Sequence, residues 1–246
     1  MSTLSGGLFF GEIKKDYEEF IKLFSSNELN ELGLDQDYKV LHKKVYIFKE
    51  LLNECEIADT TALSYSLDTL GSLIEYIHLL SQHRYKLAAS LLRGSMETFA
   101  KALIHISSLR DSNGFTNNIE LAVSKISQDY IVNFLKLTRN KPLKTTIGNA
   151  YREVLKNLYW NLCDIVHSRD TTYNHCYEYL ESILNNEFEE SKYRVLYDYA
   201  ILLLDKMLVI FYIQNMETIN KNMNEIKLEY IISQLESDYH QIFRTQ

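Results

Sequence analysis

Histidine and arginine are the residue types in this sequence that could carry chemistry on a phosphate. His167 ends a helical pattern, and Asp164 lies three residues before it, where a carboxylate could orient the imidazole. A histidine exchanges protons near neutral pH, and an arginine keeps its charge and can hold a phosphate. Arg93 and Glu97 lie four residues apart on another helical pattern. They form either a solvated ion-pair face or an inward-facing pair beside His167.

A second arginine and histidine follow shortly after His167. Arg169 and His175 have five residues between them, in a stretch whose composition is also typical of an exposed turn. Asn161, like Asp164, lies on a helical turn adjacent to His167. The sequence therefore offers two histidines as proton carriers and leaves open which of them is used.

The segment that precedes His167 is strongly basic. Residues 136–156 carry six basic side chains against the single acid Glu153, in a chain whose net charge is −7. The six are Lys136, Arg139, Lys141, Lys144, Arg152 and Lys156. Such a patch suits contact with a phosphate backbone, and it is also typical of a solvated helix face. Because the whole chain is acidic, contact with a nucleic acid has to come from a local patch of this kind.

Helices must position all of these residues. The 246 residues include one proline and eight glycines, whereas ordinary proteins contain roughly 5% proline and 7% glycine. A β-sandwich or barrel needs turn residues every ~8–12 positions, so we predict an all-α fold. We expect a single-domain antiparallel helical bundle over 60–215, with an N-terminal helical extension over 1–59 and a C-terminal helix over 216–246, packed as one domain.

The spacing of apolar residues predicts where the helices lie. The expected helices span 10–24, 38–55, 62–80, 86–108, a segment from the end of the 111–118 loop to about 137, 145–167, 176–184 and 193–220, with an amphipathic tail to 243. Asp59 is expected to cap the helix over 62–80. Pro142 is expected to end a helix. Three glycines inside helical patterns are expected to allow close helix approach: Gly71, Gly94 and Gly148.

The most apolar run, Ala200 to Ile213, is expected to be a buried core helix. Asp205 and Lys206 lie in its middle, and each charge at the centre of a bilayer would cost roughly 2.5–3.5 kcal/mol. We therefore expect no membrane partner. The first residues, 1–11, show no basic and apolar pattern of a signal peptide.

The cysteines and the absence of nucleotide-binding motifs further limit the reactions and cofactors that the sequence allows. The three cysteines show no disulfide framework, which favours free thiols and a cytoplasmic location. Cys163 and His167 share a helix face, and His175 and Cys176 follow, a set that could suggest zinc. Adjacent residues rarely face the same ion, so we expect no metal. The sequence has no glycine-rich phosphate loop or dinucleotide motif, and we expect no cofactor.

Two segments resemble a known superfamily when they are read together. They are LLRGSME at residues 91–97 and LYWNLCDIVHS at residues 158–168. The pattern resembles the HEPN superfamily (higher eukaryote and prokaryote nucleotide-binding domains) over roughly residues 60–215. The resemblance implies an up-and-down helical bundle that commonly dimerises. It also implies the metal-independent endoribonucleases of phage defence, toxin–antitoxin and CRISPR-associated systems.

The site of that superfamily pairs an arginine with a histidine, with four to six residues between them. The positions where the arginine partner of His167 would stand hold Trp160, Asn161 and Leu162. Arg169 and His175 match the pattern literally. Tyr177 follows as His-x-Tyr, which resembles toxins whose tyrosine is modified by a partner nucleotidyltransferase. Trp160 itself is expected in the core rather than as a stacking platform for a base.

The resemblance implies an endoribonuclease of a prokaryotic antiviral defence or toxin–antitoxin system. Its general acid–base would be His167 or His175, and its phosphate holder Arg169 or Arg93, with Glu97 organising the site. Expected substrate contacts are Asn161, Asp164, Arg152, Lys156 and Lys144. Expected partners are a second copy of the chain, RNA, and an antitoxin or other defence-system protein. The alternatives are a non-catalytic HEPN-like module that binds a nucleotide, RNA or a protein, and a helical scaffold without a ligand.

Overall fold

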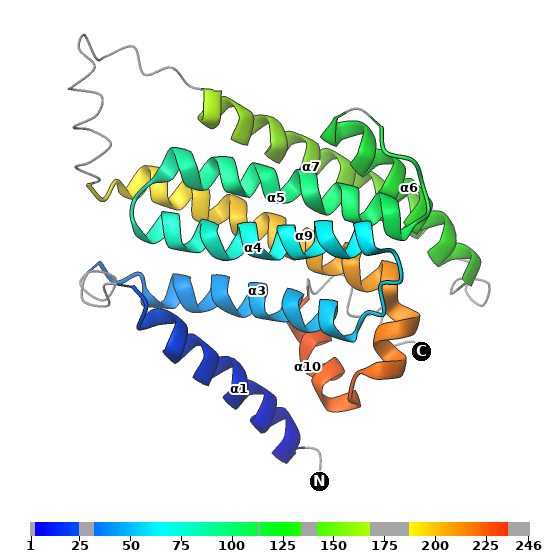
Figure 1. Cartoon of the computed structure of the whole chain (residues 1–246), viewed down its shortest axis with the longest axis horizontal. Helices are drawn as coiled ribbons and strands as arrows, with labels where there is room; N and C mark the ends of the chain where they lie inside the picture. The colour runs from blue at the N-terminus through cyan, green and yellow to red at the C-terminus, as the bar shows by residue number, and fades with distance from the viewer. Residues whose placement is uncertain (1–2, 25–31, 113, 134–141, 168–186, 236–246) are drawn as a thin grey trace.

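The computed structural model is built of α-helices packed side by side (Figure 1). It describes residues 3–24, 32–112, 114–133, 142–167 and 187–235, and none of these lies in a β-strand. The helices are α1 (Thr3–Ile21), α3 (Asp35–Glu54), α4 (Thr60–Ser81), α5 (Tyr85–Ile106), α6 (Phe115–Asn133), α7 (Pro142–His167), α9 (Glu190–Asn222) and α10 (Glu225–Gln234). The predicted all-α helical bundle is confirmed.

The helix boundaries follow from local signals in the sequence. The Asp59 carboxylate accepts a hydrogen bond of 2.8 Å from the backbone N–H of Ala62, which confirms the predicted cap of α4. Several predicted boundaries differ from the structure, and α1 begins at Thr3 instead of residue 10. Helix α6 begins at Phe115, inside the predicted 111–118 loop, and Pro142 is the first residue of α7. Proline suits that first position because its missing N–H has no partner in the first turn.

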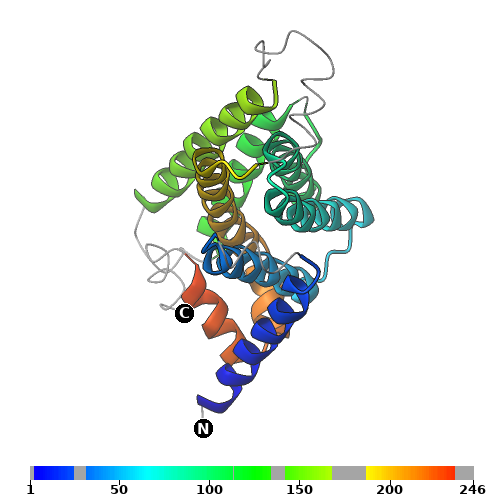
Figure 2. The same cartoon turned by 90° about the vertical axis from the view of Figure 1, so that its left-hand side faces the viewer.

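Helix α9 runs through the middle of the bundle, where it contacts α3, α5, α6 and α7 (Figure 2). Its apolar run from Ala200 is buried over most of its length, as predicted. The charges inside this run have partners, because Asp205 pairs with Lys44 of α3 and Lys206 lies 5.2 Å over the Tyr151 ring. Among the described helices, none is both long enough and apolar enough to cross a membrane.

Helix α9 bends near its C-terminal end. Asn215 has φ −114° and ψ 16°, which lies outside the helical region. Its side-chain amide donates a 2.9 Å hydrogen bond to the carbonyl of Phe211. The side chain thus satisfies a backbone acceptor at the point where the regular helix is interrupted. The bend turns the last two turns of α9 toward α10.

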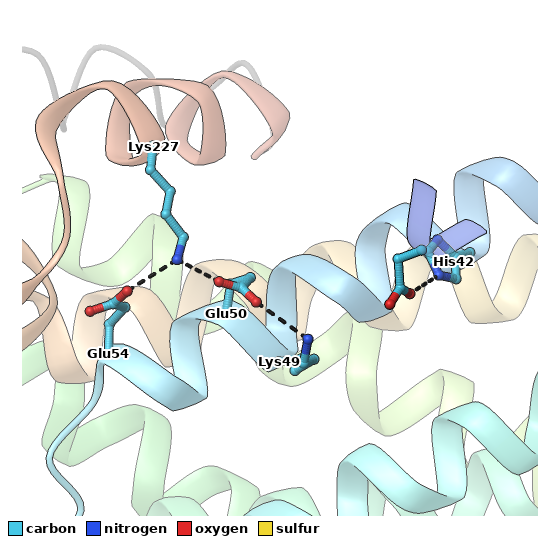
Figure 3. Close-up of polar contacts among 6 residues, drawn as sticks. His42, Lys49, Glu50, Glu54 and Lys227 are labelled. Carbon is cyan, nitrogen blue, oxygen red and sulfur yellow. Dashed lines mark hydrogen bonds and ion pairs between the residues drawn. The ribbon is translucent and has the colours of Figure 1, made fainter. Parts of the chain in front are cut away.

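Helices α1 and α10 form an outer layer on α3, at the lower end of the bundle in Figure 1. The α3–α10 cluster, defined as Lys49, Glu50, Glu54 and Lys227, holds α10 in place (Figure 3). Lys227 pairs with Glu50 and lies 3.0 Å from Glu54 Oε1. Burial alone would lower the pKa of Lys227, but hydrogen bonds to the two glutamates outweigh it and raise that pKa. Lys227 is therefore held as a cation between two carboxylates.

Helix α1 is attached to α3 by a mixed aromatic and polar contact. His42 Nε2 lies 2.7 Å from Asp16 Oδ2 (Figure 3). The imidazole packs against the rings of Tyr17 and Phe20 at centroid distances of 5.3 and 5.0 Å. Burial lowers the pKa of His42, and the neighbouring Asp16 carboxylate only partly opposes this.

Two of the glycine predictions are wrong. A Cβ added at Gly71 or Gly94 would meet no atom within 4 Å, so neither glycine permits a close helix contact. Gly148 is buried in α7. The error has a simple cause, since a glycine inside a helical pattern does not reveal which side of its helix faces a neighbour.

Candidate functional site

Helices α5 and α7 pack against each other in opposite directions, and the predicted site residues meet between them. Arg93 of α5 lies beside the last turn of α7, whereas Glu97, one turn later in α5, lies beside an earlier turn of α7. The apolar face of α5 turns toward the core through Leu92, Met96 and Phe99. Arg93 and Glu97 therefore stand at the edge of the helix contact, partly covered and partly open to water.

Arg93 and His167 are in direct contact, although 74 positions separate them in the sequence. The Nη1 atom of Arg93 lies 3.1 Å from Nε2 of His167. Arginine can only donate, so Nε2 of His167 accepts and its ring proton sits on Nδ1 in this geometry. The contact thus directs Nε2 of His167 toward the guanidinium of Arg93.

Glu97 approaches a different nitrogen of the same guanidinium. Its Oε1 lies 3.6 Å from Nε of Arg93, a distance at which charges attract but no hydrogen bond forms. Nε of Arg93 is buried and makes no hydrogen bond to any described residue. Nη1 also lies 4.0 Å from the sulfur of Cys163. Arg93 is 23% exposed, so its guanidinium is positioned by the protein and still reachable from solvent.

Tyr159 completes this group and was not singled out from the sequence. Its hydroxyl donates a 2.8 Å hydrogen bond to Glu97, and its ring stacks on Phe115 at a centroid distance of 4.5 Å. Burial, followed by the hydrogen bond to Glu97, raises the pKa of Tyr159. A signal was present, because Tyr159 lies four residues before Cys163 and eight before His167, on one side of α7. We call Arg93, Glu97, Tyr159, Cys163 and His167 the α5–α7 cluster.

The remaining predicted residues of α7 lie on its exposed side or point elsewhere. Asn161, Asp164 and Lys156 are exposed. No hydrogen bond among the described residues joins Asp164 to His167, whose Nε2 faces Arg93. Arg152 donates a 2.9 Å hydrogen bond to the Ser124 hydroxyl of α6, away from the cluster.

Trp160 corrects a sequence-based expectation. It is 53% exposed, so its predicted place in the core is wrong. The buried hydrophobic residues of α7, among those whose burial the structure describes, are Tyr151, Leu155, Leu158 and Leu162. Trp160 lies two residues after Leu158, about 200° around the helix, and therefore on the opposite side. Its ring meets the neighbouring Tyr159 ring edge-on, at a centroid distance of 5.7 Å.

Several predicted residues lie outside the described part of the chain. Arg169, His175 and Tyr177 belong to residues 168–186, which the structure does not describe. Lys144 lies within α7, but the structure does not describe its side chain. Lys136, Arg139 and Lys141 fall in residues 134–141, outside the described ranges. The literal Arg169–His175 motif therefore stays a prediction.

Within the described residues, His, Cys, Asp and Glu nowhere gather in groups of three that could hold a metal ion. Comparison with models of known protein families, with curated proteins and with solved structures returns no match for this chain.

Proposed function

We propose that this protein is a HEPN-like endoribonuclease whose reactive pair is Arg93 and His167. The observation that carries the proposal is the 3.1 Å contact between the guanidinium of Arg93 and the imidazole of His167. The resemblance calls for an arginine a few residues before the histidine, and this sequence has none there. Arg93 supplies the same chemical group from α5 instead of from the histidine's own helix.

The chemistry follows from these two groups. The 2′-oxygen of a ribose attacks the adjacent phosphorus while the bond from phosphorus to the 5′-oxygen breaks, leaving a 2′,3′-cyclic phosphate and a 5′-hydroxyl. When Arg93 turns from Nε2 of His167 to the phosphate, that nitrogen becomes free to take the proton from the 2′-hydroxyl, or in its protonated form to give one to the leaving oxygen. Arg93 binds the phosphate oxygens and the charge that develops on them. Glu97 and Tyr159 hold the guanidinium in position.

Cleavage of a defined single-stranded RNA in the presence of EDTA tests this proposal. The wild-type protein is expected to produce 2′,3′-cyclic phosphate ends, identified by mass spectrometry. His167→Ala is expected to reduce the rate by about 10²–10⁴-fold, the usual contribution of a general acid or base. His105→Ala is the matched control, because His105 lies on α5 and is paired with Asp111 at 3.2 Å, away from the cluster.

Two results would overturn the assignment. The enzyme proposal fails if wild-type protein leaves every RNA intact. If His167→Ala cleaves normally while His175→Ala does not, the reaction belongs to the Arg169–His175 motif instead.

The second candidate is a non-catalytic HEPN-like module that binds RNA, a nucleotide or a protein. One observation favours it: among the described residues His167 is the only histidine in the α5–α7 cluster, whereas strand cleavage needs both a proton acceptor and a proton donor. A second copy of the chain could supply the other group in a homodimer. RNA binding without cleavage, in protein shown to be dimeric by sedimentation, would favour this module.

The resemblance also supports a role as an effector of a prokaryotic defence or toxin–antitoxin system, with an antitoxin or another defence protein as partner. Controlled expression in a bacterial host tests this role. Wild-type protein is expected to arrest growth, and His167→Ala is expected to relieve the arrest at equal protein level. Equal growth with both proteins argues against a toxic effector.

A further inference from the structure

Four exposed side chains of α7 lie along one face of the helix. They are Lys156, Trp160, Asp164 and His167, spaced by four, four and three residues. Residues with this spacing lie one above another on a helix. From Trp160 to His167 the distance along the helix axis is about 10 Å. That is about three times the ~3.4 Å spacing of stacked nucleotides in one strand.

Trp160 is the unusual member of this row. Tryptophan is enriched at binding interfaces, because its ring is largely apolar and its N–H can find a polar partner. The Trp160 ring contacts the Tyr159 ring, which is itself fixed in place. Tyr159 stacks on Phe115 and donates a hydrogen bond to Glu97. Trp160 is therefore an apolar ring held next to the α5–α7 cluster and open to solvent.

We propose that Trp160 is a stacking platform for an unpaired base of the RNA, and that it restricts the substrate to single strands. This inference rests on the proposed function of Arg93 and His167. A base in a single strand can lie flat on an aromatic side chain, whereas a paired base in a duplex is covered by its neighbours. Trp160 lies at the distance that places the stacked base a few nucleotides from the phosphate at Arg93.

The charged residues of this α7 face, which carries Lys156, Trp160, Asp164 and His167, are compatible with an RNA strand that runs along the helix. Lys156 is an exposed cation one turn beyond Trp160, where it can pair with a phosphate of the same strand. Asp164 is exposed between Trp160 and His167 and repels phosphate. It can accept a hydrogen bond from a base N–H. The row therefore favours a base over its middle and phosphates at its two ends.

Trp160 is the single tryptophan of the chain, so tryptophan fluorescence reports on it alone. In the His167→Ala protein, which binds without cutting, a single-stranded RNA oligonucleotide is expected to quench the emission. A duplex of the same sequence is expected to leave it unchanged. Trp160→Ala is expected to weaken binding of the labelled strand, measured by anisotropy, by about 5- to 100-fold. Trp160→Phe keeps an aromatic face and is expected to recover most of the affinity.

The matched control is Phe10→Ala on α1. Phe10 is 54% exposed, as Trp160 is 53% exposed, and it lies far from the α5–α7 cluster in the sequence and on another layer of the fold. Its loss is expected to change neither binding nor cleavage. In cleaving protein with His167 intact, Trp160→Ala is expected to raise KM more than it lowers kcat.

The outcomes separate this inference from the proposed function. If the strand binds and is cleaved but does not quench Trp160, the stacking platform is wrong and the nuclease stands. If the strand quenches Trp160 but is never cleaved, the stacking platform stands and the nuclease is wrong. If quenching depends on protein concentration without RNA, Trp160 packs against a second copy, and the inference is overturned.

Discussion

Two polar clusters join helices in this protein, and they differ in how their charges are compensated. In the α3–α10 cluster, Lys227 lies between Glu50 and Glu54, so the cation has an opposite charge on each side. In the α5–α7 cluster, Arg93 contacts the imidazole of His167 and approaches the Glu97 carboxylate only to 3.6 Å.

On the proposed function, this difference distinguishes a structural contact from a catalytic one. Lys227 is 20% exposed and Arg93 is 23% exposed, so burial does not distinguish the two cations. Their partners do. Two carboxylates satisfy the charge of Lys227, whereas the guanidinium of Arg93 keeps donors that a phosphate could use. We therefore expect the first cluster to carry stability and the second to carry activity.

The largest expected effect concerns activity. Arg93→Met removes the guanidinium but keeps an apolar stem, and it is expected to slow RNA cleavage by about 10²–10³-fold, as loss of one transition-state donor does. Lys227→Met is expected to leave the rate per folded molecule within about threefold, because the charges of its cluster are satisfied inside the protein. Cleavage rates of the two variants, each corrected for folded protein, check this. If Arg93→Met and Lys227→Met slow RNA cleavage equally, the proposed difference between the two clusters is wrong.

The same two variants are expected to reverse their order in stability. Lys227→Met leaves Glu54 without its cation and Glu50 with only Lys49 at 3.5 Å, and we expect it to lower the free energy of unfolding by about 2 kcal/mol. Arg93→Met is expected to lower it by less than about 1 kcal/mol, because its cluster is open to water. Urea unfolding measures both values. Lys221→Met, at an exposed position of α9, serves as the control. A larger loss for Arg93→Met than for Lys227→Met would contradict the prediction.

A pH effect is expected at the α1–α3 contact, where burial lowers the pKa of His42 below its ordinary value of 6.5. The unfolded chain then takes up the proton before the folded protein does. The stabilising contribution is complete above pH 6.5, and it is lost as the pH falls through the lower folded-state pKa. Wild-type protein should lose stability between about pH 7 and about pH 5, and His42→Gln should lose less. The prediction fails if both proteins show the same decrease in urea unfolding.

The smallest expected effect is a gain in stability beside Arg93. Gly94 lies inside α5, and a Cβ there meets no atom within 4 Å. Gly94→Ala is expected to raise the free energy of unfolding by about 0.5–1 kcal/mol, because alanine loses less backbone freedom in a helix. The rate of RNA cleavage should not change. A gain in stability with an intact rate would show that stability and activity can be varied separately at the α5–α7 cluster. A loss of stability would mean that the position is more crowded than the structure indicates.

Much of the fold could be predicted because its signals are local. Asp59 predicts the start of α4, and the apolar run from Ala200 predicts a buried helix. Both predictions succeed because a helix cap and an apolar stretch depend only on neighbouring residues. Trp160 shows a preventable error. The buried spacing of Leu155, Leu158 and Leu162 already places it on the opposite side of α7. The prediction relied on residue type where position was the better guide.

The sequence by itself determined that the chain is helical, approximately where its helices begin and end, and which faces of them are apolar. Only the tertiary structure decided that Arg93 of α5 meets His167 of α7, with Glu97 and Tyr159 beside them. The physical reason is the range of each signal. Helix propensity and apolar spacing act over a few residues, whereas a contact across 74 positions depends on how two helices pack. The sequence left open whether Arg93 and Glu97 face solvent or His167, and the packing of α5 against α7 decided for the contact with His167.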